Sequence, residues 1–200
     1  MKNFFALNII SGSIFQTQLN FKKDYLKFFK GLKYKQLQGG TNRTYISLDN
    51  DLFTKYPKEL KEVKKLITVA LKDLIKNTYM YDCDFRLTNS WGTKADSFEE
   101  SAVHCHSNSW LSGVLYLQDN NTISFSNMDK GCFSGAPREF NEYNTRNINI
   151  STHKNTLILF PSHLYHRIPP LDLKGTTRYS LAFNVLPKGS FGSGDSQTYF

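Results

Sequence analysis

Two histidines stand one residue apart in the stretch HCHSNSWLSGVLYL, which runs from His104 to Leu117. If this stretch is extended, its side chains alternate between two faces, so His104 and His106 point the same way and Cys105 points the other. Two imidazoles placed in this way can bind one metal ion. By itself the pair is more typical of polar residues at a strand end, because a metal site needs a further ligand from elsewhere in the chain.

Candidates for that ligand lie in LILFPSHLYHRIPP, where an apolar run leads into Pro161 and then to His163 and His166. Residues three apart on an extended chain face opposite sides, so only one of these two histidines joins a site easily. His153, in the polar stretch STHKN, is expected to be a solvated loop residue.

An arginine opens the apolar stretch RYSLAFNVL, in which Arg178, Ser180, Ala182 and Asn184 share one strand face. A buried guanidinium is costly unless a carboxylate or phosphate pairs with it, so this position is a second indication of a functional site. The alternative is an arginine on an edge strand whose guanidinium reaches water.

The elements that must position these residues follow from hydrophobic spacing. Residues 24–35 predict a weak helix that the QLQGGTN turn ends, and residues 58–76 predict a strong one. In the strong helix apolar residues recur every three or four positions: Leu60, Val63, Ile67, Ala70, Leu71 and Leu74. From about residue 80, short apolar or alternating runs indicate antiparallel strands at 85–91, 112–117, 122–127, 148–152, 156–162 and 178–186. The fold class predicted is mainly β, a sandwich or jelly roll with N-terminal helices.

The composition limits the functions open to this chain of 200 residues. Its 40% hydrophobic content suits one domain with a core, and no run approaches the roughly 18 apolar residues of a membrane span. The net charge of +8 comes largely from lysines at helical spacing, which favours solvated helix faces over a polyanion-binding surface. The three cysteines, Cys83, Cys105 and Cys132, form no CxxC pair, so we expect a reducing, cytoplasmic location and no signal peptide.

The order of these motifs resembles that of the 2-oxoglutarate/Fe(II)-dependent oxygenase superfamily. The segments NSW at 89–91, HCHSNSWLSGVLYL, LILFPSHLYH and RYSLAFN are similar to a branch found in marine bacteria and phages, many of whose members are known only from sequence. The resemblance covers about residues 85–186. It implies a double-stranded β-helix, a jelly roll of cupin type whose open end holds one Fe(II).

The resemblance also implies roles for individual residues. His104 matches the first iron ligand and His166 the distal one, while Arg178 and Ser180 match the pair that holds the far carboxylate of 2-oxoglutarate. Tyr116 occupies a position from which such enzymes hydrogen-bond this co-substrate. The implied reaction is hydroxylation of an unidentified small molecule or protein side chain by dioxygen, with succinate and CO2 as co-products.

The chain departs from the family pattern at His106, because most relatives carry an aspartate or glutamate there. Three neutral histidines would leave the iron site without the negative charge of that carboxylate. Asn108, Asp119 or Glu99 could instead supply the ligand. Three-histidine iron sites occur in cupin dioxygenases, so a metal dioxygenase that does not use 2-oxoglutarate is the alternative function, and a noncatalytic jelly-roll protein is a second one.

We expect a single domain over residues 1–200, with helical support at about 20–78, a β core at about 80–187 and a flexible tail at 188–200. The polar segment 127–147 is a candidate substrate lid. Trp110, Phe133 and Tyr165 are candidate pocket walls, although each fits an ordinary core as well. The sequence does not identify the substrate or the oligomeric state, and it does not favour a nucleic-acid partner.

Overall fold

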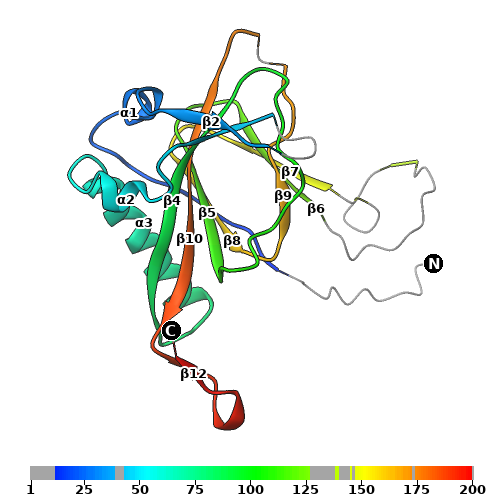
Figure 1. The fold of residues 1–200 in the computed structure, drawn as a ribbon. Coiled ribbons are helices and arrows are strands. Elements are labelled where there is room, and N and C mark those ends of the chain that lie inside the picture. The colour runs from blue at the N-terminus through cyan, green and yellow to red at the C-terminus, as the bar shows by residue number, and fades with distance from the viewer. Residues whose placement is uncertain are drawn as a thin grey trace.

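Two facing antiparallel sheets form the core of the computed structural model, which describes residues 12–38, 43–126, 138–139, 145, 147–172 and 174–199 (Figure 1). The larger sheet has the strand order β1-β8-β5-β10-β4-β3-β2. Its strands are β1 (Phe15–Gln18), β2 (Tyr34–Gln36), β3 (Tyr45–Ser47), β4 (Asp84–Ala95), β5 (Leu111–Tyr116), β8 (Thr156–Pro161) and β10 (Arg178–Lys188). The smaller sheet has the order β7-β6-β9, with β6 (Asn121–Ser126), β7 (Asn147–Thr152) and β9 (Tyr165–Arg167).

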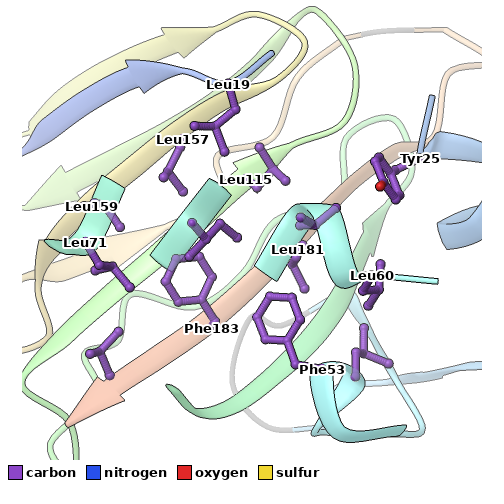
Figure 2. Packing of buried hydrophobic residues seen from close by; sticks show 14 of the residues in the cluster. Leu19, Tyr25, Phe53, Leu60, Leu71, Leu115, Leu157, Leu159, Leu181 and Phe183 are labelled. Atoms are coloured by element: carbon purple, nitrogen blue, oxygen red, sulfur yellow. The ribbon is translucent and has the colours of Figure 1, made fainter. Parts of the chain in front are cut away.

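Alternation along the central strands divides the core between two sides of the larger sheet. In β8, Leu157 and Leu159 join the cluster on the helix side, whereas Ile158 and Phe160 pack between the two sheets. In β10, Leu181 and Phe183 likewise lie on the helix side. Figure 2 shows this helix-side cluster. The other face of β10, which carries Arg178 and Ser180, is thereby turned toward the space between the sheets.

Three helices cover the outer face of the larger sheet: α1 (Leu26–Lys30), α2 (Leu52–Lys55) and α3 (Lys61–Asp73) (Figure 1). A π-helical turn, Leu74–Thr78, follows α3. The predicted spacing of α3 is confirmed, because Val63, Ile67 and Leu71 are fully buried against the sheet. Its lysines lie on the exposed face. None of the helices in the described residues is long and apolar enough to cross a membrane.

The predicted helix at residues 24–35 is wrong over its second half. The helix α1 ends at Lys30, and Tyr34–Gln36 instead form β2. The reason is tertiary, because β2 pairs with β3 and β3 pairs with β4, so the N-terminal part extends the larger sheet. β1 also joins this sheet, through β8. The helical support expected for residues 20–78 therefore also contributes strands.

The six strands predicted after residue 80 are all present, as β4, β5, β6, β7, β8 and β10. The predicted flexible tail contains a short hairpin, in which β11 (Ser190–Phe191) pairs with β12 (Thr198–Tyr199) around a 3-10 turn. Residues 1–11, Cys132, Phe133 and most of the candidate lid at 127–147 lie outside the described residues. Cys83 and Cys105 carry free thiols.

Candidate metal centre

The structure brings together the three histidines that the sequence marks as metal-ligand candidates. One ring nitrogen of each of His104, His106 and His166 lies within 4.8 Å of the others. Ring centroids are 4.5 Å apart for His104 and His166, 5.1 Å for His106 and His166, and 5.4 Å for His104 and His106. In the described part of the chain no other group of three such side chains is close enough to hold an ion.

Backbone pairing rather than a regular strand positions His104. Its N–H donates to the carbonyl of His166 at 3.0 Å, and the His166 N–H donates back to the carbonyl of His104 at 2.9 Å. The His106 N–H donates to the carbonyl of Ser162 at 2.8 Å. His104 thus lies in an isolated bridge rather than in a strand, and both rings lie close to that of His166.

Main-chain acceptors fix the tautomers of His104 and His166. The Nδ1 atom of His104 is 2.9 Å from the carbonyl oxygen of Ala102, and Nδ1 of His166 is 2.9 Å from that of Leu164. A carbonyl oxygen can only accept a hydrogen bond, so Nδ1 carries the proton in both rings. The lone pair is then on Nε2, which is the arrangement that a metal-binding histidine needs.

Side chains hold the third ring. Nδ1 of His106 is 2.7 Å from Oδ1 of Asn184 and 2.9 Å from Oγ of Ser112. Ser112 donates to the same Asn184 oxygen at 2.8 Å and is 2.7 Å from Oγ of Ser162. Strand alternation places Asn184 on the same face as Arg178 and Ser180, but the sequence assigns no role to Asn184, Ser112 or Ser162. The contacts of these three residues depend on the strand register, which the sequence does not show.

Burial keeps the inner histidines neutral. Burial lowers the pKa of His166 to about 3, with further lowering from His104. The rings of Phe160 and Phe125, with centroids 4.8 and 6.0 Å from that of His166, form the apolar wall that removes water. Burial also lowers the pKa of His106. Neutral imidazole is the form that binds a metal ion, so no proton has to leave these rings near neutral pH.

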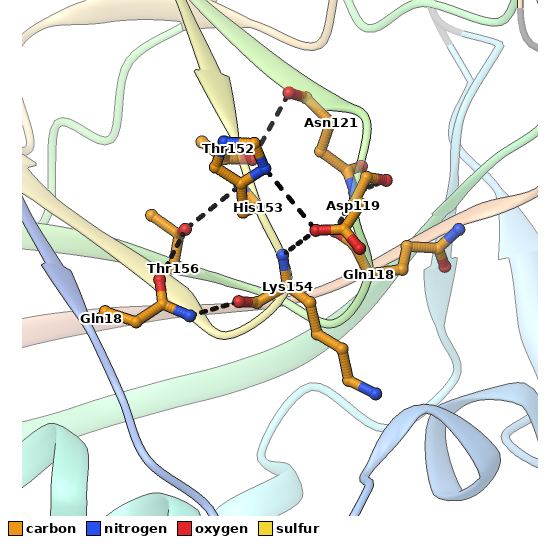
Figure 3. Close-up of polar contacts among 8 residues, drawn as sticks. All are labelled: Gln18, Gln118, Asp119, Asn121, Thr152, His153, Lys154 and Thr156. Atoms are coloured by element: carbon orange, nitrogen blue, oxygen red, sulfur yellow. Dashed lines mark hydrogen bonds and ion pairs between the residues drawn. The ribbon is translucent and has the colours of Figure 1, made fainter.

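The other second-ligand candidates lie elsewhere. Asp119 accepts a 2.9 Å hydrogen bond from the N–H of Lys154 and forms a 3.6 Å ion pair with His153 at the turns that follow β5 and β7 (Figure 3). Both of these side chains are mostly exposed, as expected for His153. Glu99 accepts from the Asp96 N–H at 2.6 Å, and Asn108 lies in an exposed turn. None of these side chains contributes to the histidine cluster.

A cavity of about 80 Å³ opens beside the three histidines. Ser180 and Tyr116 line it, as do the aromatic rings of Trp91 and Phe160. Its remaining walls are largely apolar and come from both sheets: Leu37, Ile46, Val114, Ile123, Ile168 and Ala182. Such a volume holds several water molecules or a small ligand.

The prediction that Trp110 and Tyr165 form pocket walls is wrong. Trp110 packs against Tyr79 and Tyr81 at ring-centroid distances of 6.4 and 6.1 Å, on the helix side of the larger sheet. Tyr165 is 40% exposed. Neither residue lines the cavity. Trp91, in the NSW motif, takes this place, with its ring centroid 5.7 Å from that of His106.

Arg178 is buried at the beginning of β10, with 4% of its surface exposed. β10 lies between β4 and β5, so the alternative of an edge-strand arginine is wrong. Its Nη1 donates to the carbonyl of Pro169 at 3.1 Å and Nη2 to the carbonyl of Glu99 at 2.8 Å. The guanidinium does not itself line the cavity, but it lies close enough to Tyr116 to lower the pKa of that phenol, which burial raises.

The donor set fits Fe(II). Three neutral imidazole nitrogens suit iron as well as other late divalent metals, and three protein ligands leave positions for a co-substrate and dioxygen. The acceptors at Nδ1 of all three rings supply the outer contacts that histidine ligands usually have.

Comparisons with known proteins agree with this geometry. The family model described as putative 2OG-Fe(II) oxygenase matches residues 89–184, a range that includes all six predicted site residues. No curated protein sequence matches the chain significantly.

Three similar solved structures illustrate the fold. HygX from Streptomyces hygroscopicus, with nickel, 2-oxoglutarate and hygromycin B bound, is 14% identical to this chain with a TM-score of 0.57. The match covers 87% of this chain and 82% of the HygX chain. A prolyl hydroxylase in complex with a hypoxia inducible factor peptide from Trichoplax adhaerens has 12% identity and a TM-score of 0.57, covering 88% and 83%. A Pseudomonas putida prolyl-4-hydroxylase has 14% identity and a TM-score of 0.53, covering 87% and 93%.

These likenesses confirm the expected double-stranded β-helix. The family match assigns residues 89–184 of this chain to the putative 2OG-Fe(II) oxygenases.

Proposed function

We propose that this protein hydroxylates a C–H bond of an organic substrate, with His104, His106 and His166 as the iron ligands. The observation that carries the proposal is the convergence of one ring nitrogen from each of three histidines beside one cavity. In each ring an acceptor holds the proton on Nδ1, which leaves the lone pair on Nε2 for a metal ion. Incidental polar residues at a strand end have no reason to share this orientation.

Arg178, Ser180 and Tyr116 are proposed to hold the far carboxylate of 2-oxoglutarate. Ser180 and Tyr116, which both carry hydroxyl groups, line the cavity, and Arg178 supplies positive charge near Tyr116. In the described residues no carboxylate lies within ion-pair distance of Arg178: its hydrogen bonds go to two main-chain carbonyls, and Glu99 is a more distant negative charge that favours the charged guanidinium. A buried cation that lacks a hydrogen-bonded counter-ion favours an anionic ligand.

Bound Fe(II) would supply the redox chemistry that couples dioxygen reduction to substrate oxidation. One oxygen atom enters the C–H bond of the substrate and the other enters succinate, while the former keto-acid carboxylate leaves as CO2. The protein contributes orientation and exclusion of water. The apolar walls around Phe160 and Ile123 keep the reacting groups dry.

Anaerobic spectroscopy tests the proposal. Addition of Fe(II) and 2-oxoglutarate to metal-free protein should produce the weak visible charge-transfer band of the chelate, and admission of oxygen should yield equal amounts of succinate and CO2. The His166→Ala variant should give neither signal. The exposed His163 provides the matched control, since His163→Ala should behave as the unchanged protein. A band of full intensity in His166→Ala would refute the ligand assignment.

One observation favours the alternative of a three-histidine dioxygenase that does not use 2-oxoglutarate. The guanidinium of Arg178 is already engaged by two main-chain carbonyls and lies behind the cavity wall. Such an enzyme would bind Fe(II) through the same histidines but would show no band and no succinate on addition of 2-oxoglutarate.

A further inference from the structure

The ring of His106 is held by a different kind of contact from the rings of His104 and His166. Main-chain carbonyls hold His104 and His166, whereas two side chains, Asn184 and Ser112, contact Nδ1 of His106. A carbonyl oxygen of the backbone can only accept a hydrogen bond, but a serine hydroxyl can donate as well as accept. The tautomer of His106 is therefore decided by the arrangement of this side-chain network.

One proton arrangement satisfies every contact in the network. In this arrangement the Ser162 hydroxyl donates to Oγ of Ser112, and the Ser112 hydroxyl donates to Oδ1 of Asn184. The Nδ1–H group of His106 then donates to Oδ1 of Asn184 and to Oγ of Ser112. The chain of donors ends at Oδ1 of Asn184, which acts only as an acceptor. If Asn184 were lost, Ser112 could turn its proton toward Nδ1, and His106 could then carry its proton on Nε2.

We propose that Asn184 is a positioning residue that keeps His106 in the Nδ1–H tautomer, with Nε2 available to a metal ion. This inference rests on the proposed function, because it assumes that His106 is a ligand. It explains how a histidine can act where most relatives carry a carboxylate. An acidic residue presents lone pairs in any orientation, whereas an imidazole presents one only if its tautomer is set.

Strand register makes this position rigid. Asn184 lies directly opposite Ser112 in the pairing of β10 with β5. On its other side β10 pairs with β4, and the register shifts between Asn184 and Val185. Irregularities of this kind change the direction of nearby side chains and occur often beside active sites. Ser112 and Ser162 are at most 1% exposed, so water does not compete for the network.

Nitrogen NMR of the metal-free protein tests the tautomer directly. Long-range proton–nitrogen spectra should show a protonated Nδ1 and an unprotonated Nε2 for His106. Asn184→Leu, which has a similar shape and no acceptor, should shift His106 toward the Nε2–H tautomer and weaken Co(II) or Fe(II) binding by about 10- to 100-fold. Asn184→Asp, which keeps an acceptor at the same place, should retain both the tautomer and the metal affinity.

The matched control is Asn89→Leu. Asn89 pairs with Asn184 across β4 and β10, but its side-chain amide contacts Thr88 rather than His106. This variant should keep the tautomer of His106 and the metal affinity, so any general damage to the sheet is measured separately.

The outcomes separate the two proposals. An unchanged Nδ1–H tautomer in Asn184→Leu would overturn the role of Asn184, whatever the metal affinity. A shifted tautomer with unchanged metal affinity would instead show that His106 is not a ligand, and would overturn the three-histidine assignment. A shifted tautomer together with weaker metal binding, both restored in Asn184→Asp, supports the inference.

Discussion

Replacing the buried Arg178 by methionine should separate co-substrate binding from folding. Methionine has a similar length and no charge, so Arg178→Met removes the proposed partner of the 2-oxoglutarate carboxylate with little change in packing. A charge-assisted contact in a dry pocket contributes about 2–4 kcal/mol, so the affinity for 2-oxoglutarate should fall by about 30- to 1000-fold. The histidine cluster does not contact Arg178, so metal binding should persist.

The effect of Arg178→Met on stability should be smaller, because two terms oppose each other. The carbonyls of Glu99 and Pro169 lose their donors, which costs about 1–3 kcal/mol for each one that stays unpaired. Removal of a buried cation that lacks a hydrogen-bonded carboxylate offsets part of this loss. We therefore expect the free energy of unfolding to change by no more than about 2 kcal/mol.

Titration of Ni(II)-loaded protein with 2-oxoglutarate measures the affinity without turnover, and urea unfolding measures the stability. Arg86→Met is the control, because Arg86 is an exposed arginine on β4, away from the cavity. Unchanged affinity in Arg178→Met would refute the assigned role of this residue and favour the dioxygenase that does not use 2-oxoglutarate.

Four further predictions concern the histidine centre and the larger sheet. His166→Ala should abolish binding of about one Fe(II) per chain while His163→Ala retains it, as iron analysis of the purified variants will show. His106→Asp should retain iron because it restores a carboxylate ligand, whereas His106→Ala should lose most of it; equal iron in both variants would place the second ligand elsewhere. Gly113→Ala should destabilise the fold by about 1–3 kcal/mol, since its Cβ would lie 2.2 Å from Phe183, and the added Phe183→Leu change should recover part of the loss in urea unfolding. Metal-free protein should lose stability as pH falls from 6.5 toward about 3, by at most about 1.4 kcal/mol per pH unit. In this range His166 is protonated in the unfolded chain but stays neutral in the folded protein, because burial lowers its pKa to about 3. His166→Gln should reduce this dependence of the free energy of unfolding on pH.

The amino-acid sequence by itself determined the elements that hydrophobic periodicity specifies. The three- and four-residue spacing of Val63, Ile67 and Leu71 predicts α3, and alternation predicts the six later strands. Short strands without such a pattern, such as β2 and β3, could not be found, because their pairing partners rather than their own residues hold them extended.

Motif order likewise marked the histidines and Arg178 as site candidates, and strand parity correctly separated His163 from His166. Only the tertiary structure decided which atoms those side chains present. The carbonyls of Ala102 and Leu164 and the amide of Asn184 set the three tautomers. The contact of Asn184 joins segments 78 residues apart, and its geometry depends on sheet register and on a local irregularity in β4, neither of which is encoded in the spacing of the motifs.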